Sequence, residues 1–352
     1  MPDWGRSMNQ TYEYYIVNPL TWKNEKQIDK VISAKLVRDA ENDTLGSASF
    51  DCDEDLSDKY IRTYLVTVQD GIKERIALGT YLCQSPTMSF DGKRTNVSQD
   101  AYTPLIELGE TPPPIGYSLL TGDKIMEMAA RLAREHMRAP VVPANSEKTL
   151  QTDFVSDIND TWLAFLKDLI ANADYRFDID PLGQILFEPI IETKKMQPVF
   201  TYTDDNSSIL YPDISLERDL YGVPNVVEVV YSGNEGELYS RISNDDPDSI
   251  TSTVNRGREV VYRETNPSVA AGLTQGQLDE YAEKLLSNMS SLEYTLTYTH
   301  GYCDVRVGDC VMLNYERANM TRLKAKVIRQ TISCEPGCPV EETAVFTRNL
   351  WR

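Results

Sequence analysis

The chain has 352 residues, which is long enough for two or more folded domains. Hydrophobic residues make up 41% of it, a composition typical of folded proteins rather than disordered ones. Its 54 acidic and 35 basic residues give a net charge of −19. Such a surface repels phosphate backbones and anionic lipid headgroups, which argues against a DNA-binding or membrane-binding role.

The ends and the cysteines give further expectations. No apolar stretch approaches the roughly 18–20 residues of a membrane span, and the first residues lack the basic-then-apolar pattern of a signal peptide. We therefore expect the chain to fold in cytoplasm. Cys334 and Cys338 have the spacing of a ligand pair, but no second Cys or His pair accompanies them, so no metal is predicted.

Short β-prone runs alternate with turn residues over the first 118 residues. The runs are rich in Val, Ile, Thr and Tyr, a spacing typical of antiparallel sandwiches or barrels. Phe90-Asp91-Gly92-Lys93 predicts a tight hairpin turn. The prolines of residues 111–117 cannot join a sheet ladder, so they end this β domain.

Three later segments have the apolar spacing of amphipathic helices: residues 121–137, 159–175 and 274–289. The third opens with Thr274 and Gln277 at capping-box spacing. Between the second and third, a hairpin is expected to turn at residues 180–183. The fold class predicted is therefore α+β and mostly β.

No catalytic motif stands out in the sequence. The two histidines, His136 and His300, have no Ser or Cys nucleophile motif beside them, and we interpret both as structural. An acidic protein offers many carboxylate pairs, so a glycosidase or peptidase stays open as an alternative. We predict no enzyme activity, no catalytic residues and no cofactor.

One polar stretch, SNDDPDSITSTVNRGREV at residues 243–260, lies between two apolar runs. It is too polar for a core strand and too rich in β-branched hydroxyl residues for a good helix. Four of its charged residues, Asp246, Asp248, Arg256 and Arg258, are the candidate interaction residues. Either the stretch is a solvated connection, or its arginines pair with carboxylates of a neighbouring subunit.

Several segments, in this order along one chain, resemble the baseplate hub proteins of contractile phage tails, whose relatives form the N-terminal part of siphophage tail-tip proteins. The segments are the strand at 225–230, Asp246-Pro247-Asp248-Ser249, Gly257-Arg258, the helix from Thr274, and Gly308-Asp309-Cys310-Val311. A helix and hairpin at residues 161–189 also match. The resemblance covers about residues 10–335 and is strongest from residue 155 onward.

The resemblance implies two tail-tube-like antiparallel β-barrels and a mixed α/β middle part with the three helices. We expect a first barrel at residues 1–118 and a middle domain made of 119–199 with 233–291. The second barrel would combine 200–232 with 292–335, followed by a C-terminal tail at 336–352.

The family also implies a function and partners. The chain would be a structural homotrimer that joins a six-fold tail tube to a three-fold spike or tail-tip protein, with baseplate wedge or tape-measure proteins beside it. It would be part of the virion tail baseplate, assembled in the host cytoplasm, and DNA would only pass through its lumen. A tailocin or contractile injection device hub is the alternative within this class.

Overall fold

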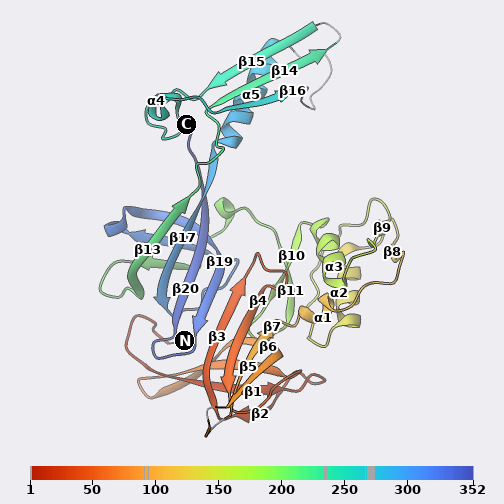
Figure 1. Cartoon of the computed structure of the whole chain (residues 1–352), viewed down its shortest axis with the longest axis vertical. Helices are drawn as coiled ribbons and strands as arrows, with labels where there is room; N and C mark the ends of the chain where they lie inside the picture. The colour runs from red at the N-terminus through yellow and green to blue at the C-terminus, as the bar shows by residue number, and fades with distance from the viewer. Residues whose placement is uncertain are drawn as a thin grey trace. The chain divides into compact units, whose positions relative to one another are not determined.

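The computed structural model describes residues 2–90, 92–93, 95–233, 236–265, 267 and 274–351. Strand makes up 47% and helix 15% of the chain so described, which confirms a mostly β fold (Figure 1). No helix among these residues has the length and apolar character needed to cross a membrane.

Thirteen strands of the described chain form one main sheet. Its N-terminal strands follow the order β2–β1–β5–β6–β7–β4–β3. They are β1 (Asn9–Val17), β2 (Asn24–Ile28), β3 (Val31–Asp39), β4 (Gly46–Cys52), β5 (Tyr60–Gln69), β6 (Ile72–Phe90) and β7 (Thr95–Tyr102). Antiparallel pairing of β6 with β7, up to Phe90 opposite Thr95, confirms the predicted hairpin. Asp91 of its turn lies outside the described residues.

The C-terminal strands continue the same sheet. They are β12 (Phe200–Thr203), β13 (Leu210–Arg218), β17 (Ser291–Gly301), β18 (Cys310–Tyr315), β19 (Met320–Ser333) and β20 (Pro339–Asn349), with the 3-10 turn η2 (Glu316–Ala318) before β19. β19 pairs antiparallel with β3, from Arg329 opposite Asp39 to Ser333 opposite Lys35. The two strand sets that were predicted as separate barrels therefore share one continuous sheet.

A helical layer follows β7. It contains α1 (Ile106–Gly109), β8 (Ser118–Leu119), α2 (Ile125–His136), β9 (Phe154–Val155), α3 (Trp162–Ala171), β10 (Tyr175–Ile179), β11 (Ile185–Pro189) and η1 (Thr193–Lys195). The apolar stripes of α2 and α3 pack into one core with Phe177 and Phe187. The predicted hairpin at 180–183 is confirmed, since the Gly183 amide donates to the Asp180 carbonyl (2.8 Å) between β10 and β11.

The chain divides into two compact units, which differ from the predicted domains. One is Met1–Ile214 with Tyr298–Thr343, and the other is Ser215–Thr297 with Ala344–Arg352. The first contains the helical layer and most of the sheet. The two pieces of the predicted middle domain, 119–199 and 233–291, belong to different units with separate hydrophobic cores.

The second unit has its own small α/β core. It contains β14 (Val226–Gly233), β15 (Gly236–Ser243), α4 (Thr253–Arg256), β16 (Val261–Thr265) and α5 (Gln275–Met289). β14 was predicted as part of the second barrel, but it lies between β15 and β16 in a three-stranded sheet. Val227 and Val229 pack there against Leu278 and Leu286 of α5. The apolar alternation of β14 predicts a buried face, whereas the identity of its partner strands depends on tertiary packing.

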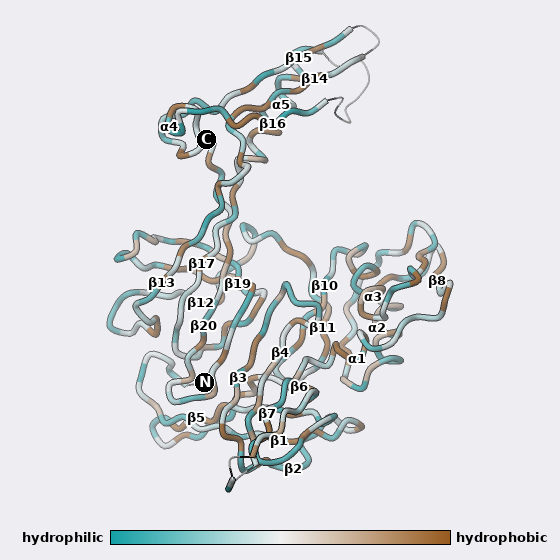
Figure 2. The backbone as a smooth tube through the Cα atoms, in the orientation of Figure 1, coloured by the Kyte–Doolittle hydropathy of each residue, from teal (hydrophilic) through white to brown (hydrophobic). Residues whose placement is uncertain are grey.

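Most of the predicted C-terminal tail, residues 336–352, is strand. Val340, Glu342 and Ala344 of β20 are buried at alternate positions, as expected of a strand with one face in a core. Trp351 is buried in the core of the second unit. Figure 2 shows how hydrophobic and hydrophilic residues alternate along the strands of the sheet.

Candidate functional site

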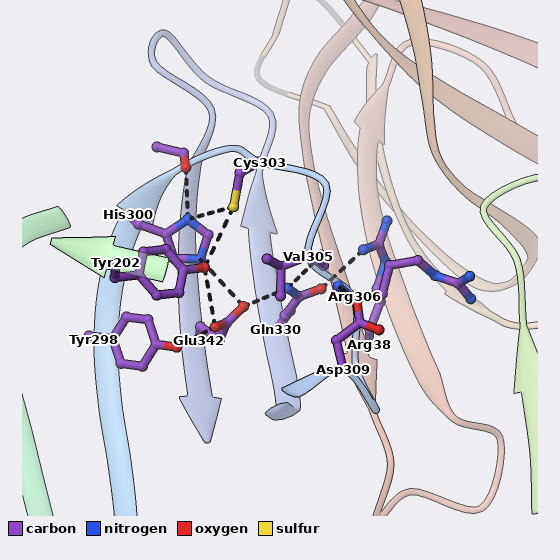
Figure 3. A network of polar contacts seen from close by, with 11 residues as sticks. Arg38, Tyr202, Tyr298, His300, Cys303, Val305, Arg306, Asp309, Gln330 and Glu342 are labelled. Atoms are coloured by element: carbon purple, nitrogen blue, oxygen red, sulfur yellow. Dashed lines mark hydrogen bonds and ion pairs between the residues drawn. The ribbon is translucent and has the colours of Figure 1, made fainter. Parts of the chain in front are cut away.

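A buried polar network lies within the first unit, on four strands of the main sheet (Figure 3). We define it as Tyr202 of β12, Tyr298 and His300 of β17, Cys303, Gln330 of β19 and Glu342 of β20. All six side chains are buried. Their strands start far apart in the sequence, so only the folded sheet brings them together.

Glu342 is the acceptor on which the network converges. It accepts hydrogen bonds from Gln330 Nε2 (2.6 Å), from Tyr202 Oη (3.4 Å) and from Tyr298 Oη. His300 Nε2 lies 3.4 Å from Glu342 Oε2, the oxygen that also accepts from Gln330. A carboxylate with 0% exposure is stable only when such donors replace its lost hydration.

His300 is held on both ring nitrogens. Its Nδ1 lies 2.7 Å from the carbonyl oxygen of Gly301, and its Nε2 also lies 3.1 Å from Tyr202 Oη. Burial lowers the pKa of His300, but hydrogen bonds with Cys303 and Glu342 and the charge of Glu342 outweigh it and raise the pKa to about 10. The imidazole therefore favours its charged form, which pairs with Glu342.

The two tyrosines act as neutral donors. Burial, followed by the charge of Glu342, raises the pKa of Tyr202 and of Tyr298 well above its usual value. The network extends to β3 of the N-terminal strand set, because Arg38 Nη1 donates to Gln330 Oε1 (3.0 Å) and Arg38 Nη2 donates to the Leu78 carbonyl (2.6 Å). It thus links the two strand sets where β3 and β19 pair.

The combination of Cys303, His300 and Glu342 has the residue types of a nucleophile, a base and an orienting acid. The geometry does not suit that chemistry, because Cys303 Sγ lies 3.9 Å from His300 Nδ1, which already faces a backbone carbonyl. Cys303 and His300 are 1% and 0% exposed, so a substrate has no path to the sulfur. The arrangement is suited to holding strands together.

His136, the other histidine, lies at the end of α2. Its ring stacks on Trp162 of α3, with ring centroids 4.2 Å apart. It therefore joins two helices of the helical layer, as the structural interpretation predicted.

The polar loop, residues 243–260, is folded upon itself in the second unit. Asn244, Ser249, Thr251 and Ser252 are buried. Asn244 Nδ2 donates to Ser249 Oγ (2.8 Å), and Asn255 Nδ2 donates to the carbonyls of Pro247 (2.7 Å) and Ser249 (2.8 Å). The hydroxyl and amide side chains of this stretch thus satisfy its own backbone, which explains its composition.

The loop ends in a one-turn helix with a cap at each end. Ser252 Oγ accepts from the Asn255 amide at the start of α4, and Gly257 adopts a left-handed conformation at its end (φ 60°). Asn225, directly before β14, binds the end of this loop, since its side chain accepts from the Val260 amide (2.7 Å) and donates to the Arg258 carbonyl (3.0 Å).

The four candidate interaction residues lie in different surroundings within this loop. Arg256 is half-buried and donates to the carbonyls of Val223 (2.7 Å) and Leu220 (3.2 Å). Burial lowers the pKa of Arg256. Asp246 accepts from the Asp248 amide (2.9 Å) in a local turn. Arg258 and Asp248 are exposed, so of the two arginines Arg258 is the one with its side chain directed to solvent.

Comparison with solved structures defines the class of fold. The chain superposes on the tail protein from Neisseria meningitidis MC58 with a TM-score of 0.60 and 13% identity, covering 97% of this chain and 98% of the other. It superposes on the 43 kDa tail protein of prophage MuSo2 from Shewanella oneidensis with a TM-score of 0.59 and 9% identity, covering 96% and 98%. Neither family models nor curated proteins match the sequence.

A third structure belongs to a secretion system. The E. coli c3393 protein, a component of the type VI secretion system with structural similarity to the T4 phage tail proteins gp27 and gp5, gives a TM-score of 0.50 and 9% identity. The alignment covers 92% of this chain and 75% of that one. The chain thus has the fold of phage tail proteins, and the resemblance stated from the sequence is confirmed at the level of fold.

Proposed function

We propose that the chain is the structural hub of a phage tail baseplate, where it joins the six-fold tail tube to a three-fold spike or tail-tip protein. The observation that carries this proposal is the likeness to a phage tail protein along 97% of this chain and 98% of the other. Because the likeness extends over almost the whole length of both chains, the two proteins share their complete fold and not just one domain.

The arrangement of the main sheet supports a homotrimer. An N-terminal and a C-terminal strand set meet at β3 and β19, so one chain offers two adjoining strand sets. Three chains would offer six of them, which suits an assembly between a six-fold ring and a three-fold one. Wedge or tape-measure proteins would bind the outside of this ring.

The charge of the chain supports a role as a DNA conduit. Residues 201–255 contain eleven Asp or Glu and two Lys or Arg, a balance of −9. A lumen lined by such residues would let a polyanion slide, because it offers few cations for counterion-release binding. We expect no measurable affinity of the purified protein for duplex DNA even at low salt, as measured by fluorescence anisotropy. Measurable binding there would contradict the conduit.

The hub of a tailocin or contractile injection device is the second candidate. The likeness to a type VI secretion component favours it specifically. Neighbouring genes distinguish the two, since capsid and terminase genes accompany a phage and are missing from an injection device.

We propose that the role is structural rather than catalytic, because the cysteine and histidine best placed for chemistry are buried within the sheet. The glycosidase or peptidase alternative is tested with a panel of peptidoglycan fragments and peptides. Hydrolysis of any of these substrates by the chain purified to homogeneity would support the glycosidase or peptidase alternative.

The hub proposal is tested by native mass spectrometry together with negative-stain imaging of the purified chain and of assembled particles. We expect three copies per particle, in a ring with a central hole. A single copy or a simple dimer in the assembled particle would overturn the proposal.

A further inference from the structure

Four large aliphatic side chains are exposed on neighbouring segments of the helical layer. They are Ile115 (91% exposed), Ile158 (79%), Leu120 (63%) and Val155 (57%), and we call them the aliphatic patch. Single exposed apolar residues are ordinary, whereas a group of them marks an interaction surface. In Figure 1 β8 and β9, which contain or adjoin these residues, lie at the outer edge of the helical layer, away from β10 and β11.

Hydrogen bonds place the segments of the patch beside each other. β8 pairs antiparallel with β9, with Ser118 opposite Val155. Leu120 is two residues beyond Ser118, so it is expected on the same side of the ribbon as Val155. The Ser156 amide donates to the Tyr117 carbonyl (2.9 Å), and the Trp162 amide donates to the Thr111 carbonyl (3.0 Å). These two bonds bracket the turns that carry Ile115 and Ile158.

Both isoleucines lie at the tips of hydrogen-bonded turns. The Tyr117 amide donates to the Pro114 carbonyl (2.9 Å) around Ile115, with Gly116 at φ 75° as a type II turn requires. The Asp160 amide donates to the Asp157 carbonyl (3.2 Å) around Ile158. Three consecutive prolines, residues 112–114, further restrict the first turn. A surface fixed in this way loses little conformational entropy when a partner binds.

Charge identifies the kind of partner. Residues 109–123 and 150–161, which carry the patch, contain five acidic residues and no Lys or Arg: Glu110, Asp123, Asp153, Asp157 and Asp160. Arg131 of α2, which interacts with Tyr117, is itself paired with Glu135 (4.0 Å). A second copy of the same surface would bring like charges together, and anionic lipid would be repelled in the same way.

We propose that the aliphatic patch docks a different protein of the same particle, through an apolar centre surrounded by Lys or Arg side chains. This proposal rests on the proposed function, because it requires that the chain belong to a multiprotein assembly. In this proposal the helical layer binds the partner protein, while the main sheet forms the ring.

The test is site-specific photocrosslinking within assembled particles. p-Benzoylphenylalanine replaces Ile115 or Ile158, and the crosslinked peptides are identified by mass spectrometry. Ile72 of β6, which is 64% exposed and lies outside the patch, is the matched control position. We expect both patch positions, but not Ile72, to crosslink to one segment of a different protein, with Lys or Arg beside the crosslinked residue.

Two variants sharpen the result. Glu110→Lys with Asp157→Lys is expected to lower the crosslink yield about tenfold, since these exposed charges would face a basic partner. Ile115→Asp with Ile158→Asp is expected to remove the partner from the particle, while Ile115→Val retains it. Both changes lie at exposed sites, so thermal unfolding of the purified chain should be unchanged.

The outcomes separate this proposal from the proposed function. Particles that contain the chain but give crosslinks only between its own copies, or none at all, overturn the aliphatic patch and leave the hub intact. Particles from which the chain is absent overturn the hub and the docking surface together.

Discussion

The polar network of the first unit and the polar loop of the second are both buried and hydrogen-bonded, yet they differ in charge. The network holds a carboxylate and a histidine that favours its charged form, with 0% exposure for both. The buried part of the loop is made of neutral amides and hydroxyls. Buried charges lose far more hydration than neutral groups, so each remaining partner matters more.

The difference predicts how each region responds to change. In the network, removal of one partner leaves the other as an uncompensated buried charge. In the loop, removal of one amide leaves only unsatisfied neutral groups. The network also joins distant strands, whereas the loop mainly satisfies its own backbone. Four experiments test this difference, beginning with the one for which we expect the greatest change.

His300→Ala is expected to lower the free energy of unfolding by about 3–5 kcal/mol, because Glu342 loses its charged partner inside the sheet. Urea denaturation of the purified chain measures it. His136→Ala is the control, and the loss of its stacking on Trp162 should cost only about 0.5–1.5 kcal/mol. If both variants lower the free energy of unfolding equally, the loss of His300 does not leave Glu342 as a destabilising unpaired charge.

The second experiment is a pH profile of stability. The pKa of His300 is about 10 in the folded chain, above its usual value of 6.5, so folding favours the protonated ring. The stabilisation is complete below pH 6.5 and is lost as the pH rises toward 10. Denaturation between pH 6.5 and 9 should show stability falling with pH in the native chain. The fall should be missing in His300→Gln, and an identical slope in both proteins would refute the charged pair.

The third experiment addresses the loop. Asn244→Ala should cost about 1–3 kcal/mol, because it removes the donor to Ser249 Oγ and the acceptor for the Asp246 amide. Since these groups are neutral, the cost should be the same at pH 6.5 and pH 9. If the loss of unfolding free energy in Asn244→Ala changes with pH as strongly as the loss in a His300 variant, the two regions do not differ in charge.

The parts of the fold that depend on local sequence could be predicted. Apolar spacing located α2, α3 and α5, and the capping box at Thr274 and Gln277 is present as expected. Leu278 and Leu286 are buried in the core of the second unit, as the predicted helical stripe requires. These features depend on residues a few positions apart, which is the range over which periodicity carries information.

The parts that depend on distant pairing could not be predicted. Nothing local indicates that β3 joins β19, or that β14 pairs in parallel with β16, because many strand pairings satisfy the same alternation. Glu342 was missed for a different reason. Its place between Val340 and Ala344 put it on the buried face of a strand, and alternation alone could have marked it, but residues 336–352 were interpreted as a tail.

The smallest expected effect comes from Arg258 in the polar loop. Arg258→Ala should change the free energy of unfolding by no more than about 0.5 kcal/mol, because its side chain is exposed. Arg256→Ala, its matched control two residues away, should cost about 1–3 kcal/mol, since Arg256 donates to two carbonyls of its own chain. If Arg258 instead pairs with a carboxylate of a neighbouring subunit, the same variant should weaken the trimer, measured by native mass spectrometry across a dilution series, without changing stability. An unfolding cost for Arg258→Ala as large as that for Arg256→Ala would mean that both arginines stabilise the loop. Of the four candidate interaction residues, only the exposed Asp248 and the half-buried Asp246 would then remain as candidates for a contact between subunits.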